Sequence, residues 1–226
     1  MTVPAWLRDV ADGAADLDPR RLSRLLPPEG GTARRAAVLV LVADWDGADS
    51  VLLLQRSSRL RSHAGQVAFP GGSAEPGDAD VVATALREAH EEAGVHPQGV
   101  EVLGTWPQLW IPVSDFAVTP VLGWWHEPQP VLADGTEMLT GALVGLADLA
   151  DPAHRCTVTA PSGWRGPGFE VGDLFVWGFT AGLLDKLLTF GGWARPWDAD
   201  ARVVPAPVRG PEPDVADDAE EELVQE

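Results

Sequence analysis

The chain contains a single cysteine, Cys156, among its 226 residues, and it contains no tyrosine. One cysteine rules out an internal disulfide and suits a reducing compartment, so we expect a cytoplasmic protein. Residues 1–13 lack a basic stretch followed by an apolar run, which does not favour a signal peptide. The longest apolar run, residues 36–43, is less than half of what a bilayer crossing needs, so we expect no membrane partner. No histidine-based constellation accompanies Cys156, and we do not expect it to act as a nucleophile.

Basic residues are also scarce relative to acidic ones, and the formal net charge is −18. Proteins that bind nucleic acid gain affinity by neutralising phosphates with Lys and Arg, so this balance argues against a nucleic-acid partner. Residues 211–226 carry eight of the acids and no base, which predicts a disordered tail. The Pro/Ala/Arg-rich stretch 201–213 would be the linker to it.

Three glutamates, Glu88, Glu91 and Glu92, stand at positions i, i+3 and i+4. On an α-helix this spacing places them on one side within about one turn. Like charges so close destabilise a helix by roughly a few tenths of a kcal/mol per pair, so a bound Mg²⁺ or Mn²⁺ would explain the arrangement. Asp80 suits the N-cap of this helix and Gly94 its carboxyl-terminal end. A separate apolar stripe would face the core: Val82, Ala85, Leu86, Ala89 and Ala93.

Three glutamates alone are more often a solvated acidic face than a metal site. Here they belong to the string REAHEEAGV, residues 87–95, which follows the turn FPGG. This string resembles the second half of the Nudix box, G-x5-E-x7-R-E-U-x-E-E-x-G-U with U aliphatic. The first half departs from the pattern, because Gly72 lies one residue too far from Arg87 and the loop glutamate is replaced by Ala79, between Asp78 and Asp80.

A second signature lies upstream, where residues 52–72 read LLLQRSSRLRSHAGQVAFPGG. They are similar to the L-L-T-x-R-S-x3-R-x3-G-x3-F-P-G-G signature of the coenzyme A pyrophosphatase branch of Nudix hydrolases, which also uses a box with one extra residue. Leu54 stands in place of the threonine. Residues 175–182, FVWGFTAG, resemble the Trp-Gly-x-Thr-Ala helix start near the end of such proteins.

The resemblance covers roughly residues 35–190 and implies an α/β fold, the Nudix-type α/β/α sandwich with a mixed β-sheet. It implies hydrolysis of the pyrophosphate bond of coenzyme A and its thioesters to 3′,5′-ADP and (acyl-)4′-phosphopantetheine. We expect a helical extension over residues 1–30 that packs on the domain, a Nudix domain over 31–200 and a tail over 201–226. The apolar and β-branched runs predict strands at 36–45, 50–55, 66–69, 101–108, 118–125 and 139–144, and a last helix near 180–188.

The acidic helix supplies the expected metal ligands Glu88, Glu91 and Glu92, with a carbonyl of Gly71 or Gly72 completing the shell. Any of the glutamates could orient the attacking water, and Glu137, in a turn before a strand, is an outside candidate for the base. A plain surface glutamate is an equal alternative there. By its helical position Arg87 points away from the carboxylates, and we expect it to pair within the preceding loop.

The densest cationic set, which suits the phosphates of coenzyme A, comprises Arg56, Arg59, Arg61 and His63. An exposed basic loop is the plain alternative. Four tryptophans could stack an adenine, although packing is the better interpretation for most: Trp106, Trp110, Trp124 and Trp125. Four histidines show no metal-like spacing and are expected at the surface: His90, His96, His126 and His154. Hydrolysis of ADP-ribose, NADH, a nucleotide sugar or an oxidised nucleotide, a non-catalytic nucleotide-binding module, and a homodimer are left open.

Overall fold

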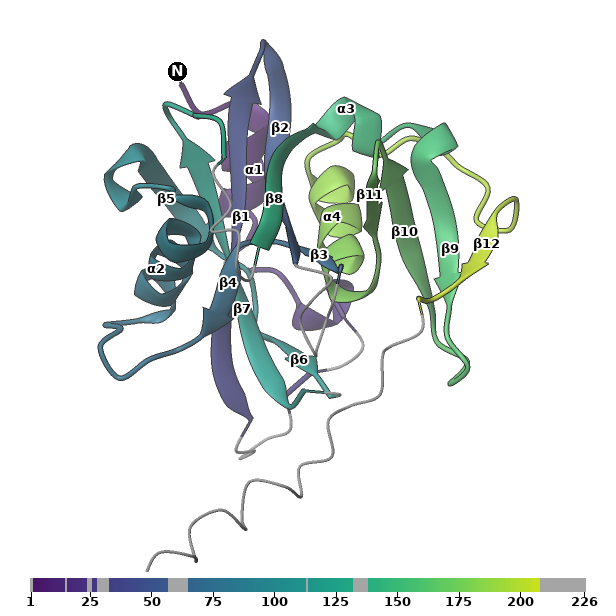
Figure 1. The fold of residues 1–226 in the computed structure, drawn as a ribbon, viewed down its shortest axis with the longest axis horizontal. Coiled ribbons are helices and arrows are strands. Elements are labelled where there is room, and N and C mark those ends of the chain that lie inside the picture. The colour runs from purple at the N-terminus through teal and green to yellow at the C-terminus, as the bar shows by residue number, and fades with distance from the viewer. Residues whose placement is uncertain are drawn as a thin grey trace, which may run out of the picture.

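A computed structural model gives the fold of the chain. It describes residues 2–14, 16–23, 26–27, 33–56, 65–112, 114–131 and 138–207. Within these residues two β-sheets and the helices around them form a layered structure (Figure 1). No helix in this part of the chain is long and apolar enough to span a membrane.

The larger sheet contains eight strands among the described residues, and its main order is β3-β2-β1-β7-β5. Its strands are β1 (Arg34–Trp45), β2 (Ala48–Arg56), β3 (Val67–Ala68), β4 (Gly71–Ser73), β5 (Val100–Thr105), β6 (Leu109–Ile111), β7 (Phe116–Trp125) and β8 (Met138–Gly145). Strand β4 pairs with β1, β6 with β7 and β8 with β2. Strands β1 and β7 are parallel and the other pairs are antiparallel, so the sheet is mixed, as predicted.

The turn-like residues Asp46-Gly47-Ala48-Asp49 separate two apolar, β-branched runs, and this pattern predicts a hairpin. Strands β1 and β2 pair in antiparallel fashion around this turn, with Trp45 opposite Ala48. Asp46 and Gly47 have φ values of +53° and +80°, which is the pair of left-handed residues that a two-residue type I′ turn requires.

Alternate residues of β1 face two different layers of the core. Leu39 and Leu41 are buried with α2 (Val81–Ala93) on one side of the sheet. Val40 and Val42 are buried on the other side, together with α1 (Ala5–Asp12) and α4 (Gly178–Phe190). The period of two in β1 thus separates the two cores, and it gives the helix-sheet-helix layering.

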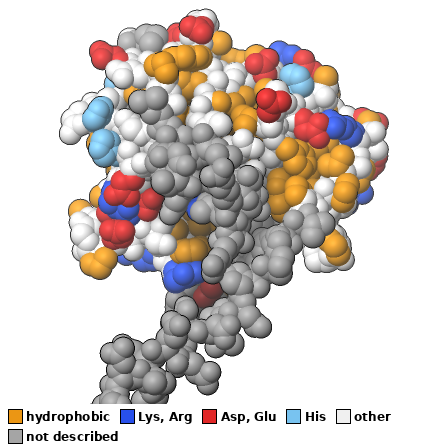
Figure 2. All heavy atoms as spheres, viewed as in Figure 1, with side chains coloured by type: hydrophobic (Ala, Val, Ile, Leu, Met, Phe, Trp, Pro, Cys, Tyr) orange, Lys and Arg blue, Asp and Glu red, His pale blue; other side chains and the backbone are white. Residues whose placement is uncertain are grey.

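A second, four-stranded sheet was not predicted from the sequence. Its order is β11-β10-β9-β12, with β9 (Arg155–Thr159), β10 (Arg165–Val171), β11 (Leu174–Val176) and β12 (Val203–Pro205). The run Gly166-Pro167-Gly168 lies in β10, and glycine and proline weaken the pattern by which a strand is recognised. Figure 2 shows hydrophobic side chains gathered on the side of the molecule where this sheet lies.

Strand β12 also corrects the predicted linker over residues 201–213. Val203–Pro205 pairs in parallel with β9, with Val204 opposite Val158. The Pro/Ala/Arg composition concealed a short edge strand, where a proline is tolerated because its missing N–H faces away from the ladder. The predicted tail over residues 211–226 lies outside the described residues.

The remaining short elements connect these layers. They are η1 (Pro19–Arg21), η2 (Pro97–Gly99), α3 (Leu146–Leu149) and η3 (Pro152–His154). Helix α1 packs on the larger sheet, where Leu7 is fully buried and the Trp6 indole N–H donates to Asp49 Oδ2 at 2.8 Å.

Candidate active site

Helix α2 begins and ends where the sequence predicted. The Asp80 side chain caps its first turn by accepting a hydrogen bond from the Ala83 N–H at 2.8 Å. Gly94 closes the last turn at φ +68°, a left-handed conformation that glycine adopts without steric cost. Ala85 and Ala89 are fully buried against the sheet. This packing fixes the direction in which the acidic side of the helix projects.

Strand β4 runs beside α2, and its two glycines bring the backbone against the carboxylates of the helix. Gly71 donates its N–H to Glu92 Oε2 at 2.9 Å. A Cβ atom on Gly71 would lie 2.7 Å from the Val38 Cα, and one on Gly72 would lie 2.6 Å from the Glu88 Cδ. Both distances are too short for real carbon contacts. A larger residue at Gly71 would clash with the β1 backbone, and one at Gly72 would displace the Glu88 carboxylate from its place against the strand.

The three predicted metal ligands differ in exposure. Glu92 is 9% exposed, and the side chains of Glu88 and Glu91 are 15% and 57% exposed. Burial raises the pKa of the Glu88 carboxyl above its ordinary value, although the neighbouring Arg87 acts in the opposite direction. The folded protein therefore holds Glu88 where its anion has lost water, a setting in which a bound cation would stabilise it.

Arg87 does not point away from the carboxylates, so that prediction was wrong. Its Nη1 donates to Glu88 Oε1 and to Glu91 Oε2, each at 3.0 Å. The side chain is long enough to fold back along the helix, and the i, i+4 spacing to Glu91 brings the two groups together. Its positive charge offsets the mutual repulsion of the glutamates. Figure 2 shows acidic and basic side chains together on the α2 side of the molecule.

The other half of the prediction for Arg87, pairing within the preceding loop, is confirmed. Arg87 Nε donates to Asp78 Oδ1 at 3.0 Å, and Nη2 donates to Asp78 Oδ2 at 3.1 Å and to the Ser73 carbonyl at 3.0 Å. Hydrogen bonds from Arg87 and from the Glu75 N–H hold the pKa of Asp78 well below its usual range. The same contact with Asp78 raises the pKa of Arg87. This fork ties the loop to the helix, and sequence analysis had not singled out Asp78 for it.

The side chains near β4 match the chemistry of a hard divalent cation, because carboxylate oxygens from α2 meet carbonyl-bearing glycine backbone. Within the described residues, however, no three histidine, cysteine or acidic side chains converge closely enough to hold a metal ion. The Arg87 guanidinium contacts two of the three glutamates instead. The assignment of Glu88, Glu91 and Glu92 as a ligand set stays a prediction.

The predicted substrate residues are only partly described. Arg59, Arg61 and His63 lie outside the described residues, as does the candidate base Glu137. Arg56 ends β2, and its backbone N–H donates to the Gln66 carbonyl at 2.9 Å, while the Gly65 N–H donates to the Arg56 carbonyl at 3.2 Å. The basic segment, which carries Arg56, Arg59, Arg61 and His63, therefore begins and ends at residues that are hydrogen-bonded to each other where β2 pairs with β3. From β3 the chain continues into β4.

The predicted adenine-stacking tryptophans separate into two groups. Trp106, Trp124 and Trp125 are buried in the core, in agreement with the packing interpretation. Trp110 lies on β6, and its indole N–H donates to Asp115 Oδ1 at 3.1 Å. Cys156 is fully buried, and burial raises the pKa of its thiol, which disfavours the reactive thiolate.

The four histidines lie at least partly at the surface. His90 and His96 are exposed, and their rings lie 5.1 Å apart. His126 and His154 are half-buried, and they contact Glu101 Oε2 at 3.0 Å and the Asp148 carbonyl at 2.8 Å.

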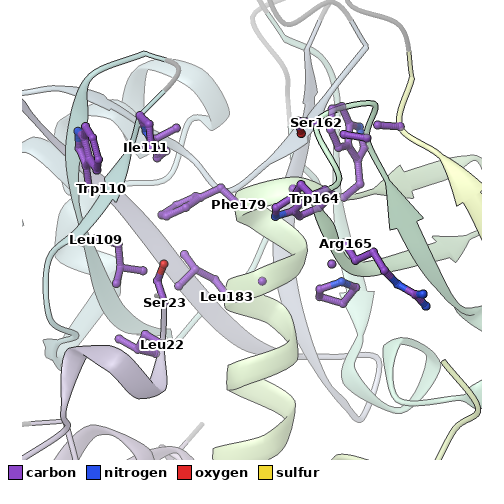
Figure 3. Close-up of a pocket in the computed structure, with 18 of the residues that line it drawn as sticks. Leu22, Ser23, Leu109, Trp110, Ile111, Ser162, Trp164, Arg165, Phe179 and Leu183 are labelled. Atoms are coloured by element: carbon purple, nitrogen blue, oxygen red, sulfur yellow. The ribbon is translucent and has the colours of Figure 1, made fainter. Parts of the chain in front are cut away.

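A large cavity, which sequence analysis missed, lies between α4, β6 and the turn from β9 to β10. Its volume is about 710 Å³. Figure 3 shows Phe179 and Leu183 of α4 lying between the strand that carries Trp110 and the turn that carries Trp164. Its residues come from five separate parts of the chain, so no single sequence window could have indicated it.

Comparisons with known proteins agree with this fold. A family model described as NUDIX domain matches residues 33–154. A protein from Klebsiella pneumoniae named uncharacterized Nudix hydrolase NudL is 40% identical over 205 residues, covering 83% of this chain and 100% of the relative. A protein of the same name from Citrobacter koseri is 41% identical over 167 residues, covering 68% and 81%.

Among solved structures, a Nudix hydrolase from M. smegmatis, RenU, superposes with a TM-score of 0.52 at 22% identity, covering 74% of this chain and 93% of the other. A NUDIX hydrolase from Alicyclobacillus acidocaldarius gives a TM-score of 0.51 at 20% identity, covering 70% and 91%. The chain belongs to the Nudix family. It is a Nudix hydrolase of the pyrophosphatase type, with the α/β/α fold that the sequence predicted.

Proposed function

We propose that this Nudix hydrolase cleaves the pyrophosphate bond of coenzyme A and its thioesters, with Mg²⁺ or Mn²⁺, to 3′,5′-ADP and (acyl-)4′-phosphopantetheine. The observation that carries the proposal is the arrangement around β4, where the Gly71-Gly72 backbone lies against Glu92 and Glu88. This glycine pair ends the segment 52–72 whose sequence resembles the coenzyme A pyrophosphatase signature. The sequence resemblance to that branch indicates coenzyme A as the substrate, and the carboxylates beside β4 support metal-dependent hydrolysis.

Glu88, Glu91 and Glu92 would hold the metal, together with a carbonyl of Gly71 or Gly72. The ion would neutralise the pyrophosphate oxygens, polarise phosphorus and lower the pKa of a bound water. The protein contributes position: the Gly71 N–H holds the Glu92 carboxylate at 2.9 Å, and the Asp78 fork holds Arg87 beside Glu88 and Glu91. One of the helix glutamates, or Glu137, would orient the attacking water and accept its proton.

The basic segment would bind the remaining phosphate of the substrate. Coenzyme A carries a 3′-phosphate in addition to its pyrophosphate, and guanidinium groups match phosphate oxygens in a bidentate way. Arg56 ends β2 and the chain returns at Gly65, so Arg59, Arg61 and His63 belong to a segment that starts and ends beside β3. Chain continuity from β3 to β4 supports placing this segment near the glycine pair.

Product analysis tests the proposal directly. Purified protein is incubated with coenzyme A, ADP-ribose and NADH, each with Mg²⁺ or with Mn²⁺, and the products are identified by mass spectrometry. We expect 3′,5′-ADP and 4′-phosphopantetheine from coenzyme A, at a kcat/KM well above that for the other two substrates. Products that retain the pyrophosphate, free thiol released from an acyl derivative, or faster cleavage of ADP-ribose or NADH would contradict it.

A further inference from the structure

The cavity beside α4 has a mostly apolar lining. Four of its residues are prolines, which have no backbone N–H to offer a ligand: Pro112, Pro161, Pro167 and Pro207. Its aromatic residues are Trp110, Trp164, Trp177 and Phe179. Among the described residues no carboxylate lines it, and the one cation there, Arg165, is paired with Asp200 at 2.8 Å. A charged or strongly hydrogen-bonding ligand would lose water here with few partners in return, whereas an apolar chain would gain from leaving water.

Gly182 leaves part of the cavity open, although glycine lowers the stability of the helix that contains it. It lies inside α4, where glycine is less favourable than alanine, and it lines the cavity. A Cβ atom built on it would meet no atom within 4 Å, so close packing does not require glycine at this position. Gly191, after the same helix, is different, because its Cβ would lie 2.8 Å from the Trp6 ring. The open space at Gly182 is therefore explained by a ligand better than by the fold.

The register of the larger sheet gives the distance between the cavity and the glycine pair. Leu109, which lines the cavity, lies opposite Val118 of β7, and Val118 lies opposite Ala36 of β1. Ala36 in turn lies opposite Ser73, the residue that follows the glycine pair. Three steps between neighbouring strands span about 14 Å. The side chains of Ala36, Val118 and Leu109 are buried, and Leu109 packs on the α4 side of the sheet, whereas Gly72 lies against Glu88 of α2. The register therefore gives the separation between the glycine pair and the cavity, which an extended substrate would span by passing around the sheet.

We propose that this cavity binds the apolar acyl chain of thioester substrates, so that the enzyme prefers long-chain acyl derivatives to free coenzyme A. The inference rests on the proposed function and deepens it. The pantetheine arm would cross from the pyrophosphate at β4 to β6, and the acyl chain would lie between Phe179 and Trp164, in front of Gly182. Free coenzyme A would leave the cavity unused.

The first experiment compares kcat/KM for coenzyme A with its acetyl, hexanoyl and dodecanoyl thioesters. Each methylene removed from water strengthens binding by up to about fourfold, so the dodecanoyl thioester should exceed the acetyl one by roughly tenfold or more. Replacing Gly182 with Leu should abolish this advantage by filling the space, while hydrolysis of free coenzyme A stays within about twofold of wild type. The melting temperature should not fall, because leucine is the better helix former.

Two further variants complete the design. Thr189→Leu places a similar side chain on the exposed side of the same helix and should leave the chain-length preference unchanged. Trp164→Ala removes a 37% exposed ring from the cavity wall and should lower the advantage without a folding defect. It keeps the proposal testable if Gly182→Leu does not fold.

Direct binding separates failure of this inference from failure of the proposed function. Decanoyl-pantetheine, which carries the arm and the chain but no pyrophosphate, is titrated while the fluorescence of the lining tryptophans is followed. If coenzyme A is not cleaved but the probe binds wild type and not Gly182→Leu, the proposed function fails and the cavity assignment holds. If coenzyme A is cleaved with no dependence on chain length and the probe does not bind, the assignment is overturned. An equal loss on coenzyme A and its thioesters in Gly182→Leu, or a change of oligomeric state alone, would also overturn it, by placing the nucleobase or a second copy of the chain in the cavity.

Discussion

Replacing Glu88 with Gln separates a metal ligand from a structural residue. The Glu88 carboxylate lies against Gly72 and accepts from Arg87, with its side chain 15% exposed. Burial raises its pKa in spite of that arginine, so the ionised form is disfavoured in the folded protein without metal. The amide has nearly the same shape, can still accept from Arg87, and carries no charge. The variant should therefore fold as well as the wild type when no metal is bound.

The expected magnitudes follow from two opposing effects. Losing the charge at residue 88 weakens its hydrogen bond with Arg87 and should lower the free energy of unfolding by about 1 kcal/mol, since charge-assisted hydrogen bonds contribute about 1.5–3 kcal/mol and neutral ones roughly half as much. Removing a buried charge acts in the opposite direction, so the free energy of unfolding without metal should change by less than about 1 kcal/mol, or about 2–4 °C in melting temperature at this size. A metal at a hundred times its Kd stabilises the wild type by about 2.7 kcal/mol. This stabilisation should largely disappear in the variant, and turnover should fall at least about a hundredfold.

Thermal unfolding with and without MgCl₂, alongside turnover of coenzyme A, measures both effects. Glu75→Gln is the matched control, because Glu75 is 63% exposed and lies 3.9 Å from Arg87. It should keep the metal-induced shift. Because the pKa of the Glu88 carboxyl is raised in the folded protein, this group stabilises the wild type below pH 4.5, its ordinary value, and the stabilisation is lost as the pH rises through the folded value. Glu88→Gln should lack this pH-dependent component. If Glu88→Gln is strongly destabilised without metal yet retains the full Mg²⁺ shift, Glu88 is structural and the ligand assignment is wrong.

Three further predictions test the surrounding groups. Glu92→Gln can still accept from the Gly71 N–H, so the fold should persist in circular dichroism while turnover with Mg²⁺ drops by orders of magnitude; near-normal activity would contradict a metal role. Asp78→Asn should lower the melting temperature at neutral pH, and because the pKa of Asp78 is depressed, the difference from wild type should persist above its ordinary value of 3.8 and shrink as pH falls below it. Arg61→Ala should lower kcat/KM for coenzyme A by roughly ten- to a hundredfold and much less for dephospho-coenzyme A, as one lost bidentate phosphate contact predicts. An equal loss on both substrates would place Arg61 at the pyrophosphate or in the fold.

The parts of the fold that the sequence predicted have local causes. Helix α2 carries its own start and stop in Asp80 and Gly94, and the β1–β2 hairpin carries its turn in Asp46-Gly47. The second sheet was missed because its pairing is non-local: β12 joins β9 across more than forty residues, with Val204 opposite Val158. Nothing in either short segment indicates its partner.

For the candidate site, too, the sequence predicted what depends on local spacing and missed what depends on tertiary packing. Residue spacing placed Glu88, Glu91 and Glu92 on one side of a helix, but it could not show that one is buried and another exposed, since that depends on how β4 approaches. The predicted direction of the Arg87 side chain was wrong, because a period of 3.6 residues gives the direction of the Cα–Cβ bond and not that of a long, flexible side chain. Its partner Asp78 is nine residues away, in a loop with no periodic pattern.

The second sheet has a consequence for where this domain can be divided. The family match ends at residue 154, directly before β9. Arg155, with its side chain 3% exposed, stacks between the rings of Phe169 and Trp197 at 4.4 and 4.5 Å and donates to Asp185 of α4 at 2.5 Å.

Helix α4 in turn supplies four fully or nearly fully buried leucines to the core that contains Val40 and Leu122: Leu183, Leu184, Leu187 and Leu188. A fragment that stops where the family match stops would expose to water the part of that face that α4 covers. The segment that follows the family match is therefore part of the folding unit, and exchanging it between relatives means rebuilding the core as well.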